Sequence, residues 1–318
     1  MEKYYRIINT DKKGKFDADR FLNYLRLSND RWWDVGSKES PWVFRGVGNA
    51  DKWKLIPAAW RINDGNPLNL LINKVKHLEL SRKPQRWEKN EYGVETIHWI
   101  NAECEALYQF SRLAIELGNK IPEENRSPLS SGHLYSQGPP LEVPNTETAM
   151  HAQHHGIPTR LLDWTKHPLF AAFFAAHPRF RNEESSSICV WAGNIELLKR
   201  IIVRNKYQSS LIVPLNQPGH SNEYLQAQQG LFTALKCGEE YYSLNREWPA
   251  LEDLLNDKYI NDPGGVVLDK VVLSSEHIPR LLTLLDREGI NQAALMPSKD
   301  MIAQTILDRW EINAQSHY

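Results

Sequence analysis

Cysteine is scarce in this chain. Three of its 318 residues are cysteines, Cys104, Cys189 and Cys237, and none of them belongs to a C-x-x-C pair. An odd number of cysteines at such spacings argues against a disulfide framework and against the usual cysteine patterns of zinc and redox sites. We therefore expect reduced thiols in a cytoplasmic protein.

Long apolar runs and an excess of one charge are also missing. The longest apolar run spans Leu169 to Ala176, which is far below the roughly 20 residues of a membrane-spanning helix. The first residues, MEKYYRIINTDKKGKFDADR, lack the apolar stretch of a signal peptide. A net charge of −1 provides no general attraction to nucleic acid or anionic lipid. We expect no membrane partner.

Hydrophobic and aromatic residues, by contrast, are plentiful. They are numerous enough to bury a large core, since 41% of the chain is hydrophobic. Eleven residues are tryptophan, and several stand beside charges, as in RWWD, DKWK, QRWEKN and REWP. Such positions suit half-buried rings with a solvated N–H edge. The rings either line a groove or pack densely in the interior, and the sequence leaves both interpretations open.

Hydrophobic patterning predicts helices early in the chain and strands later. Helical spacing marks RFLNYLRLS after Asp17 or Asp19, residues 66–89, residues 95–117 and the tail segments HIPRLLTLLDREGI and SKDMIAQTILDRW. Strand signals mark PWVFRGVG, SSICVWAG, SSLIVPLN, part of LQAQQGLFTAL and GGVVLDKVVLSS. Strict β-α-β alternation is rare, so we expect an α+β fold with a mixed or antiparallel central β-sheet and flanking helices.

Three histidines end a predicted helix in the segment HAQHHGIP. His151, His154 and His155 share one face of its last turn. Two such histidines can hold zinc, but the glutamate of H-E-x-x-H and a third ligand are missing. Histidines also suit a helix C-terminus, where the dipole is negative. We favour that interpretation and expect no metal; a metal-dependent hydrolase or nuclease using these histidines with Asp163 is the less favoured alternative.

The next segment, GIPTRLLDWT, combines a charged pair with a predicted strand. Strand alternation places Leu162 and Trp164 on one face, and the Arg160 guanidinium in so apolar a run needs a polar partner. We predict that His154, Arg160 and Asp163 are hydrogen-bonded to one another around the Gly156–Pro158 turn. Their role would be structural support of a site.

The same segment ends at a junction. Thr165 falls where the predicted strand ends and HPLFAAFFAA begins as a helix. At such junctions hydroxyls and amides point at ligands. Thr165 is therefore a candidate ligand contact, with Thr159 and Trp164 as further supporting residues.

Taken in order, these motifs resemble those of the FRG domain family, named after its (F/Y)RG tripeptide. FRG at Phe44 to Gly46 precedes WKLIPAAWR, QHHGIPTRLLDWT with HPLFAAFFAA, NEYLQAQQGLF and a closing LLDREGINQAALMP. The resemblance spans residues 42–297, and we expect a single FRG-type domain over residues 1–318 with extensions at 1–40 and 299–318. Tyr224 stands where the family usually has an arginine, so we do not assign a phosphate-binding role to this position. Family members occur in bacterial and phage proteins, which implies a phage defence or toxin setting.

The order of these motifs is also similar to the three-part site of ADP-ribosyltransferases. That site has an arginine or histidine followed by a small residue, a strand ending in a hydroxyl or aromatic before an alanine-containing helix, and a late strand with Glu or Gln. Arg45-Gly46, Thr165 and Gln228 with Gly230 follow this layout. The resemblance implies an ADP-ribosyltransferase-like core and an NAD-dependent transferase or NAD glycohydrolase, with NAD as its substrate.

Each matching residue has a chemical role in this interpretation. Arg45 offers a planar fork to a diphosphate or ribose, and Gly46 lets the dinucleotide approach the backbone. Thr165 would bond the nicotinamide ribose. Gln228 would orient a ribose hydroxyl as the glycosidic bond breaks, although an amide lacks the charge of a carboxylate. Glu223 is a nearby carboxylate that could substitute.

Structural interpretations and another class of function stay open. Arg45 could instead pair with Asp163, Gln228 could be a turn amide, and Gly46 and Gly230 could serve turn geometry. The alternative function is a non-catalytic sensor that recognises a nucleotide or peptide through a tryptophan-lined cleft. The sequence indicates neither the acceptor, protein or nucleic acid, nor the oligomeric state.

Overall fold

The computed structural model of the protein describes most of the chain. The described residues are 4–11, 14–61, 65–80, 94–119, 127–131, 145–180, 185–201, 212–215, 229–235, 238–256 and 262–315. Across these ranges, no helix has both the length and the apolar character needed to cross a membrane.

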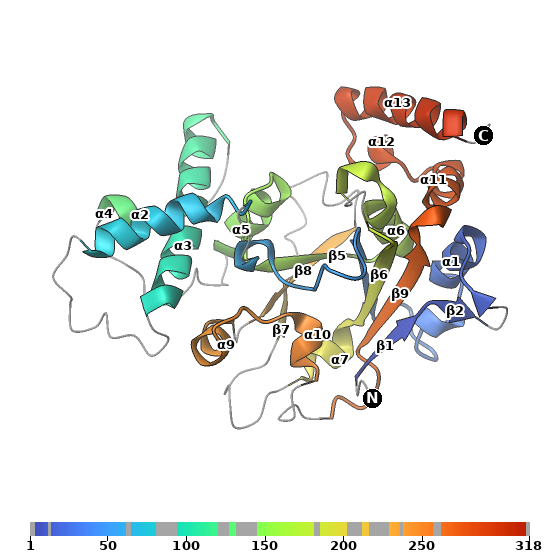
Figure 1. The fold of residues 1–318 in the computed structure, drawn as a ribbon, viewed down its shortest axis with the longest axis horizontal. Helices are drawn as coiled ribbons and strands as arrows, with labels where there is room; N and C mark the ends of the chain where they lie inside the picture. The colour runs from blue at the N-terminus through green and yellow to red at the C-terminus, as the bar shows by residue number, and fades with distance from the viewer. Residues whose placement is uncertain are drawn as a thin grey trace.

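Seven strands form one open sheet in the order β1-β9-β6-β4-β5-β8-β7 (Figure 1). β1 runs parallel to β9, and every other neighbouring pair in this sheet is antiparallel. The expected mixed sheet and α+β class are therefore confirmed. Two short strands, β2 (Thr10–Asp11) and β3 (Gly14–Lys15), pair separately. The strands of the sheet are β1 (Tyr5–Ile8), β4 (Trp42–Val47), β5 (Leu161–Thr165), β6 (Ser187–Asn194), β7 (Ile212–Leu215), β8 (Gly230–Leu235) and β9 (Leu268–Ser274).

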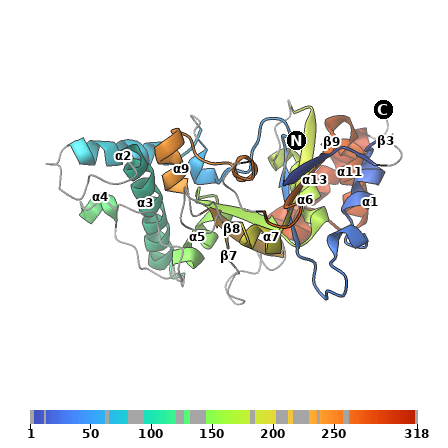
Figure 2. The ribbon, with the colours of Figure 1, turned by 90° about the horizontal axis from the view of Figure 1, so that it is seen from below.

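The helices form two groups on opposite sides of the molecule (Figures 1 and 2). One group comprises α1 (Ala18–Leu25), α6 (Pro168–Ala176), α11 (Ile278–Arg287), α12 (Gln292–Leu295) and α13 (Lys299–Gln315). The other comprises α2 (Leu68–Leu80), α3 (Val94–Glu116), α4 (Pro128–Ser131), α5 (Asn145–His154) and α9 (Gly238–Asn245). The short helices α7 (Ile195–Lys199) and α10 (Leu251–Leu254) lie below the sheet in Figure 1, and 3₁₀ turns occupy residues 30–32, 58–60, 178–180 and 275–277.

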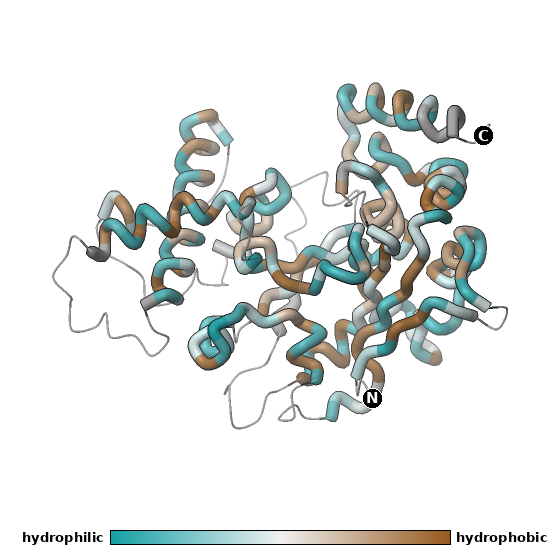
Figure 3. Tube along the Cα trace, viewed as in Figure 1, coloured by the Kyte–Doolittle hydropathy of each residue, from teal (hydrophilic) through white to brown (hydrophobic). Residues whose placement is uncertain are grey.

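The strands divide the interior into two packed layers because their side chains alternate between faces. On β4, Trp42 and Phe44 pack with α1, α6 and α11, whereas Val43 and Val47 pack with the opposite layer. Apolar residues accordingly mark the central strands and α6, while α2, α3 and α13 alternate between polar and apolar (Figure 3). This division fixes the direction in which each site residue points.

Gly46 permits the close approach of α6 to β4. A Cβ atom at this position would lie 2.0 Å from the carbonyl oxygen of Ala171 and 2.7 Å from the nitrogen of Ala175. Both are helix backbone atoms, so a side chain could be accommodated only if the helix moved. Packing against α6 thus requires glycine at position 46. The two roles expected from the sequence, close approach of a dinucleotide and turn geometry, did not include this packing.

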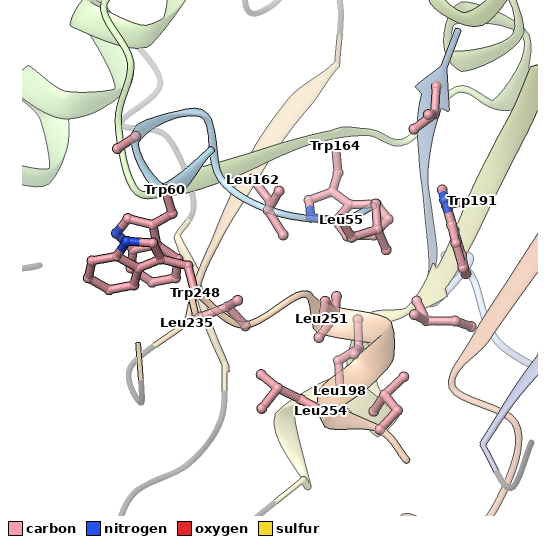
Figure 4. Close-up of a cluster of buried hydrophobic side chains, with 14 of the residues drawn as sticks. Leu55, Trp60, Leu162, Trp164, Trp191, Leu198, Leu235, Trp248, Leu251 and Leu254 are labelled. Carbon is pink, nitrogen blue, oxygen red and sulfur yellow. The ribbon is translucent and has the colours of Figure 1, made fainter. Parts of the chain in front are cut away.

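Most of the tryptophans are packing residues. Seven tryptophans are buried among the described residues, and Trp60 stacks on Trp248 with ring centroids 4.7 Å apart (Figure 4). Trp164 lies in the same cluster and donates from its indole nitrogen to Thr233 Oγ1 at 2.9 Å. Trp33, Trp53 and Trp310 are exposed. The dense-packing interpretation is correct for these seven, which are Trp32, Trp42, Trp60, Trp99, Trp164, Trp191 and Trp248.

Candidate functional site

Three neighbouring strands bring the predicted motifs together. Thr165, the last residue of β5, is paired with Phe44 of β4 on one side and with Gly230 of β8 on the other. Arg45 and Gly46 directly follow Phe44. Segments that are far apart in the sequence therefore meet at one place in the sheet.

A cleft opens beside this meeting point because β4 and β5 diverge. The two strands share only one recorded pair, Phe44 with Thr165, whereas β4 pairs with β6 at six positions. The cleft has a volume of about 270 Å³. Its lining combines apolar rings with a few polar groups, as is typical of ligand sites. Its lining residues are Phe44, Arg45, Gly46, Gln153, His154, Asp163, Trp164, Thr165, Ala171, Phe174, Phe180, Gly230, Leu231, Phe232 and Met296.

The Arg45 guanidinium crosses the opening between the diverging strands. Its Nη1 donates to the backbone carbonyl of Asp163 at 2.8 Å and to Asp163 Oδ1. Gln153 of α5 donates to the same carboxylate oxygen at 3.0 Å. The Arg45 side chain is 15% exposed and that of Asp163 is 59% exposed. The ion pair with Asp163, the structural alternative for Arg45, is therefore present, and its carboxylate is open to the cleft.

Arg160 does not bind Asp163 or His154, so the predicted triad is wrong. Its guanidinium instead donates to Glu103 at 2.8 and 3.2 Å and to Glu239 at 2.6 Å, all within the interior. The reason is strand alternation, which turns residues 160, 162 and 164 to one face and Asp163 to the other. Figure 4 shows Leu162 and Trp164 on the same side of β5.

The ends of α5 and of the following turn support the cleft wall. Gly156, with φ +90°, ends this helix as predicted. Thr159 donates to the Gln153 amide oxygen and accepts from the Leu161 N–H at 3.2 Å. Gln153 is thereby held between Thr159 and Asp163. The sequence analysis did not single out Gln153, although it stands inside the QHHGIPTRLLDWT motif.

His154 lines the cleft at the end of α5. Its ring lies 5.3 Å from that of His155, and desolvation followed by the charges of His155 and His151 lowers its pKa. His155 stacks on Phe110 instead. Among the described residues, no three His, Cys, Asp or Glu side chains gather as a metal site would require.

The junction between β5 and α6 forms the floor of the site. Thr165 Oγ1 accepts from the backbone N–H of His167 at 3.0 Å, so the hydroxyl orders the entry into α6. The Lys166 N–H donates to the Gln229 carbonyl at 3.1 Å. Gln229 has φ +48°, a left-handed backbone conformation that is uncommon for residues other than glycine. Gln228, Glu223 and Tyr224 lie outside the described residues.

Arg61 adds a second cation near the cleft. Desolvation and the neighbouring Arg45 charge lower its pKa, and the Asp163 charge raises it. For Asp163, desolvation raises the pKa of the carboxyl, but the charge and hydrogen bond of Arg45 prevail and leave it below its usual value. The group thus comprises two cations and one ionised carboxylate. The sequence assigned no role to Arg61 or Phe174, although they stand inside the WKLIPAAWR and HPLFAAFFAA motifs, and Phe180 lies outside every motif quoted above.

Comparison with known proteins supports the family resemblance. The model of the FRG domain matches residues 40–184. This range contains β4, β5, α5 and α6, and with them Arg45, Asp163 and Thr165. Neither the curated proteins nor the solved structures include a match to the chain. The NEYLQAQQGLF and closing segments of the wider resemblance lie beyond the matched range.

Proposed function

We propose that this chain, which belongs to the FRG domain family, binds NAD in the cleft between β4 and β5 and breaks its nicotinamide–ribose bond. The ADP-ribose group would pass to an acceptor or to water. The observation that carries the proposal is the meeting of Arg45, Thr165 and Gly230 on three neighbouring strands beside one cleft. An NAD-consuming activity would suit the defence or toxin setting that the family resemblance implies.

The cleft fits one end of the dinucleotide. Its volume of about 270 Å³ is at the lower limit of common ligand pockets, roughly 300 Å³, so it would enclose the nicotinamide riboside end and leave the adenosine outside. Phe174 and Phe180, whose ring centroids lie 5.1 Å apart, provide an apolar wall for the planar ring. Arg45 and Arg61 would attract the diphosphate at the mouth.

The reaction requires stabilisation of positive charge on the sugar. As the C–N glycosidic bond breaks, nicotinamide leaves as a neutral molecule with the electron pair, and the ribose carbon becomes cation-like. A hydroxyl of the acceptor, or water, then forms the new bond and releases a proton. Thr165 would contact the nicotinamide ribose, and Gln228 would orient its hydroxyls.

One observation favours a second candidate, a nucleotide-binding module without catalysis. The late strand β8 has the sequence GLFTAL and carries no carboxylate. Such a module would bind NAD in the same cleft and release no nicotinamide. Measuring binding and nicotinamide release in parallel, with and without protein and nucleic-acid acceptors, separates the two candidates.

The Arg45→Lys variant tests the proposed grip on NAD. Lysine keeps the charge and one hydrogen bond to Asp163 but loses the planar fork. We expect NAD binding to weaken by on the order of 1.5–3 kcal/mol, with a small change in melting temperature. Titration calorimetry with NAD and thermal denaturation would measure the two effects.

Arg6→Lys is the matched control. Arg6 is also a strand arginine, and it donates two hydrogen bonds to Asp269 on the next strand, at 2.7 and 2.6 Å. It lies on β1, at the far edge of the sheet from the cleft. This variant should leave NAD binding unchanged. Equal effects of both variants on binding, or a loss of stability alone at Arg45, would count against the proposal.

A further inference from the structure

We propose that Asp163 is the catalytic carboxylate of this cleft. The inference rests on the proposed function. In the ADP-ribosyltransferase layout this chain has an amide, Gln228, where a glutamate would carry a negative charge, and we assign that charge to Asp163. From the sequence, Asp163 was predicted to support the site, or to act with the histidines in the less favoured metal-dependent alternative. Its place in the structure is different, because it stands in the cleft and not among the buried groups around Arg160.

The side chain is both held and open. Oδ1 accepts from Arg45 of β4 and from Gln153 of α5, and Gln153 is itself fixed by Thr159. Two donors from different elements orient the carboxylate, as a preorganised reactive group requires. Nevertheless, 59% of the side chain is exposed. The exposed part of the carboxylate is therefore accessible to a ligand in the cleft.

Its charge and its neighbours suit a cationic transition state. The nearby Arg45 holds the pKa of Asp163 low, despite desolvation that raises it, so the carboxylate is ionised at neutral pH. Phe44, Phe174 and Phe180 line the same cleft, so a ligand bound against these rings would displace water from around the carboxylate and strengthen its electrostatic interactions. A fixed negative charge in such a site stabilises positive charge that develops during reaction.

The step that Asp163 assists is the loss of nicotinamide. The C–N bond breaks, nicotinamide takes the electron pair, and the positive charge develops on the ribose ring beside the carboxylate. Asp163 forms no covalent bond and accepts no proton in this step. Water or an acceptor hydroxyl adds to the ribose carbon, and its proton passes to solvent.

Asp163→Asn tests the assignment, because asparagine keeps the shape and an oxygen acceptor for Arg45 but removes the charge. We expect nicotinamide release to fall by about 100-fold or more. The affinity for ADP, which lacks the nicotinamide ribose, should not fall, because its diphosphate is attracted by Arg45 and is repelled by the Asp163 charge. Asp163→Glu, which keeps the charge but displaces it, should retain more activity than Asp163→Asn even if the asparagine variant is less stable.

Asp51→Asn provides the matched control. Asp51 also accepts side-chain hydrogen bonds on the surface, from Ser186 at 2.8 Å and Ser187 at 3.1 Å, but it does not line the cleft. It should keep full activity. An active wild-type protein whose Asp163→Asn variant turns over NAD equally well would overturn this assignment and leave the proposed function standing. A wild-type protein that neither binds nor consumes NAD would remove both.

Discussion

Arg160 is buried between two carboxylates in the interior. Its guanidinium is 7% exposed and pairs with Glu103 and Glu239, and Trp60 also donates to Glu103 at 3.1 Å. Burial raises the pKa of Glu103 even though the Arg160 charge opposes the shift. One cation thus compensates two buried acids, and the segment before β5 is attached to α3 and α9 through it.

Removing this cation should be costly. In Arg160→Ala both carboxylates lose their partner in a low-dielectric interior, so we expect the free energy of unfolding to fall by about 3–5 kcal/mol. The Glu103 carboxylate of the variant binds a proton more readily when folded than when unfolded, so stability is retained at low pH and lost as pH rises through the raised pKa of Glu103. Urea denaturation should show a smaller loss near pH 5 than near pH 8.

An exposed arginine provides the comparison. Arg112 pairs with Glu116 one helical turn away, and both side chains are more than half exposed. Arg112→Ala should cost no more than about 0.5 kcal/mol, with little dependence on pH. Similar losses in the two variants would show that the buried cluster contributes nothing beyond a surface pair.

At the residue scale, sequence reasoning identified the important positions better than their partners. Arg45, Asp163 and Thr165 were singled out, and the pair of Arg45 with Asp163 was one of the alternatives considered. The partners of Arg160 could not be inferred, because Glu103 and Glu239 lie 57 and 79 positions away. No local pattern marks a carboxylate that becomes buried only when distant helices pack together.

Local elements followed from the sequence where their patterns were strong. Helix α1 begins after Asp17, whose carboxylate accepts from the Arg20 N–H at 2.8 Å as a capping residue should. Strands β4, β5, β6 and β9 coincide with the predicted apolar segments. Strand β1 was missed because its residues, YRII, are only half-buried or exposed at the edge of the sheet. The predicted helix over residues 66–89 is observed for Leu68–Leu80; residues 66 and 67 precede the helix, and residues 81–89 lie outside the described residues.

The contact between β4 and α6 provides a test at the scale of elements. Gly46→Ala would place a methyl group against the backbone of Ala171 and Ala175, and α6 could not adapt by rotating a side chain. We expect a loss of about 3 kcal/mol or more, together with weaker ligand binding, because Phe174 of α6 lines the cleft. Thermal denaturation and NAD titration would measure both effects.

Gly265→Ala is the control for this substitution. A Cβ at Gly265 would meet only the Leu197 side chain, at an ordinary contact distance of 3.4 Å. It should change stability by less than about 1 kcal/mol. If Gly46→Ala proves as mild as Gly265→Ala, the close packing of α6 on β4 is not what requires glycine at position 46.

At the scale of the whole molecule, the arrangement of strands creates the cleft, and this arrangement could not be read from the sequence. β5 is followed along the chain by β6, yet β4 lies between them in the sheet, and β8 pairs with the other side of β5. The FRG-matched range of residues 40–184 supplies β4 and β5, whereas β6 and β8 come from beyond it. The site therefore depends on strands both within and outside the matched range.

The central claim is that this cleft binds the nicotinamide end of NAD. The most direct test is a crystal structure with an NAD analogue in which a carbon–carbon bond replaces the cleavable glycosidic bond. We expect its pyridine ring beside Phe174 and Phe180, its adjoining ribose within hydrogen-bonding distance of Asp163, and its diphosphate near Arg45. An analogue bound elsewhere on the protein, or an empty cleft at saturating concentration, would contradict the claim.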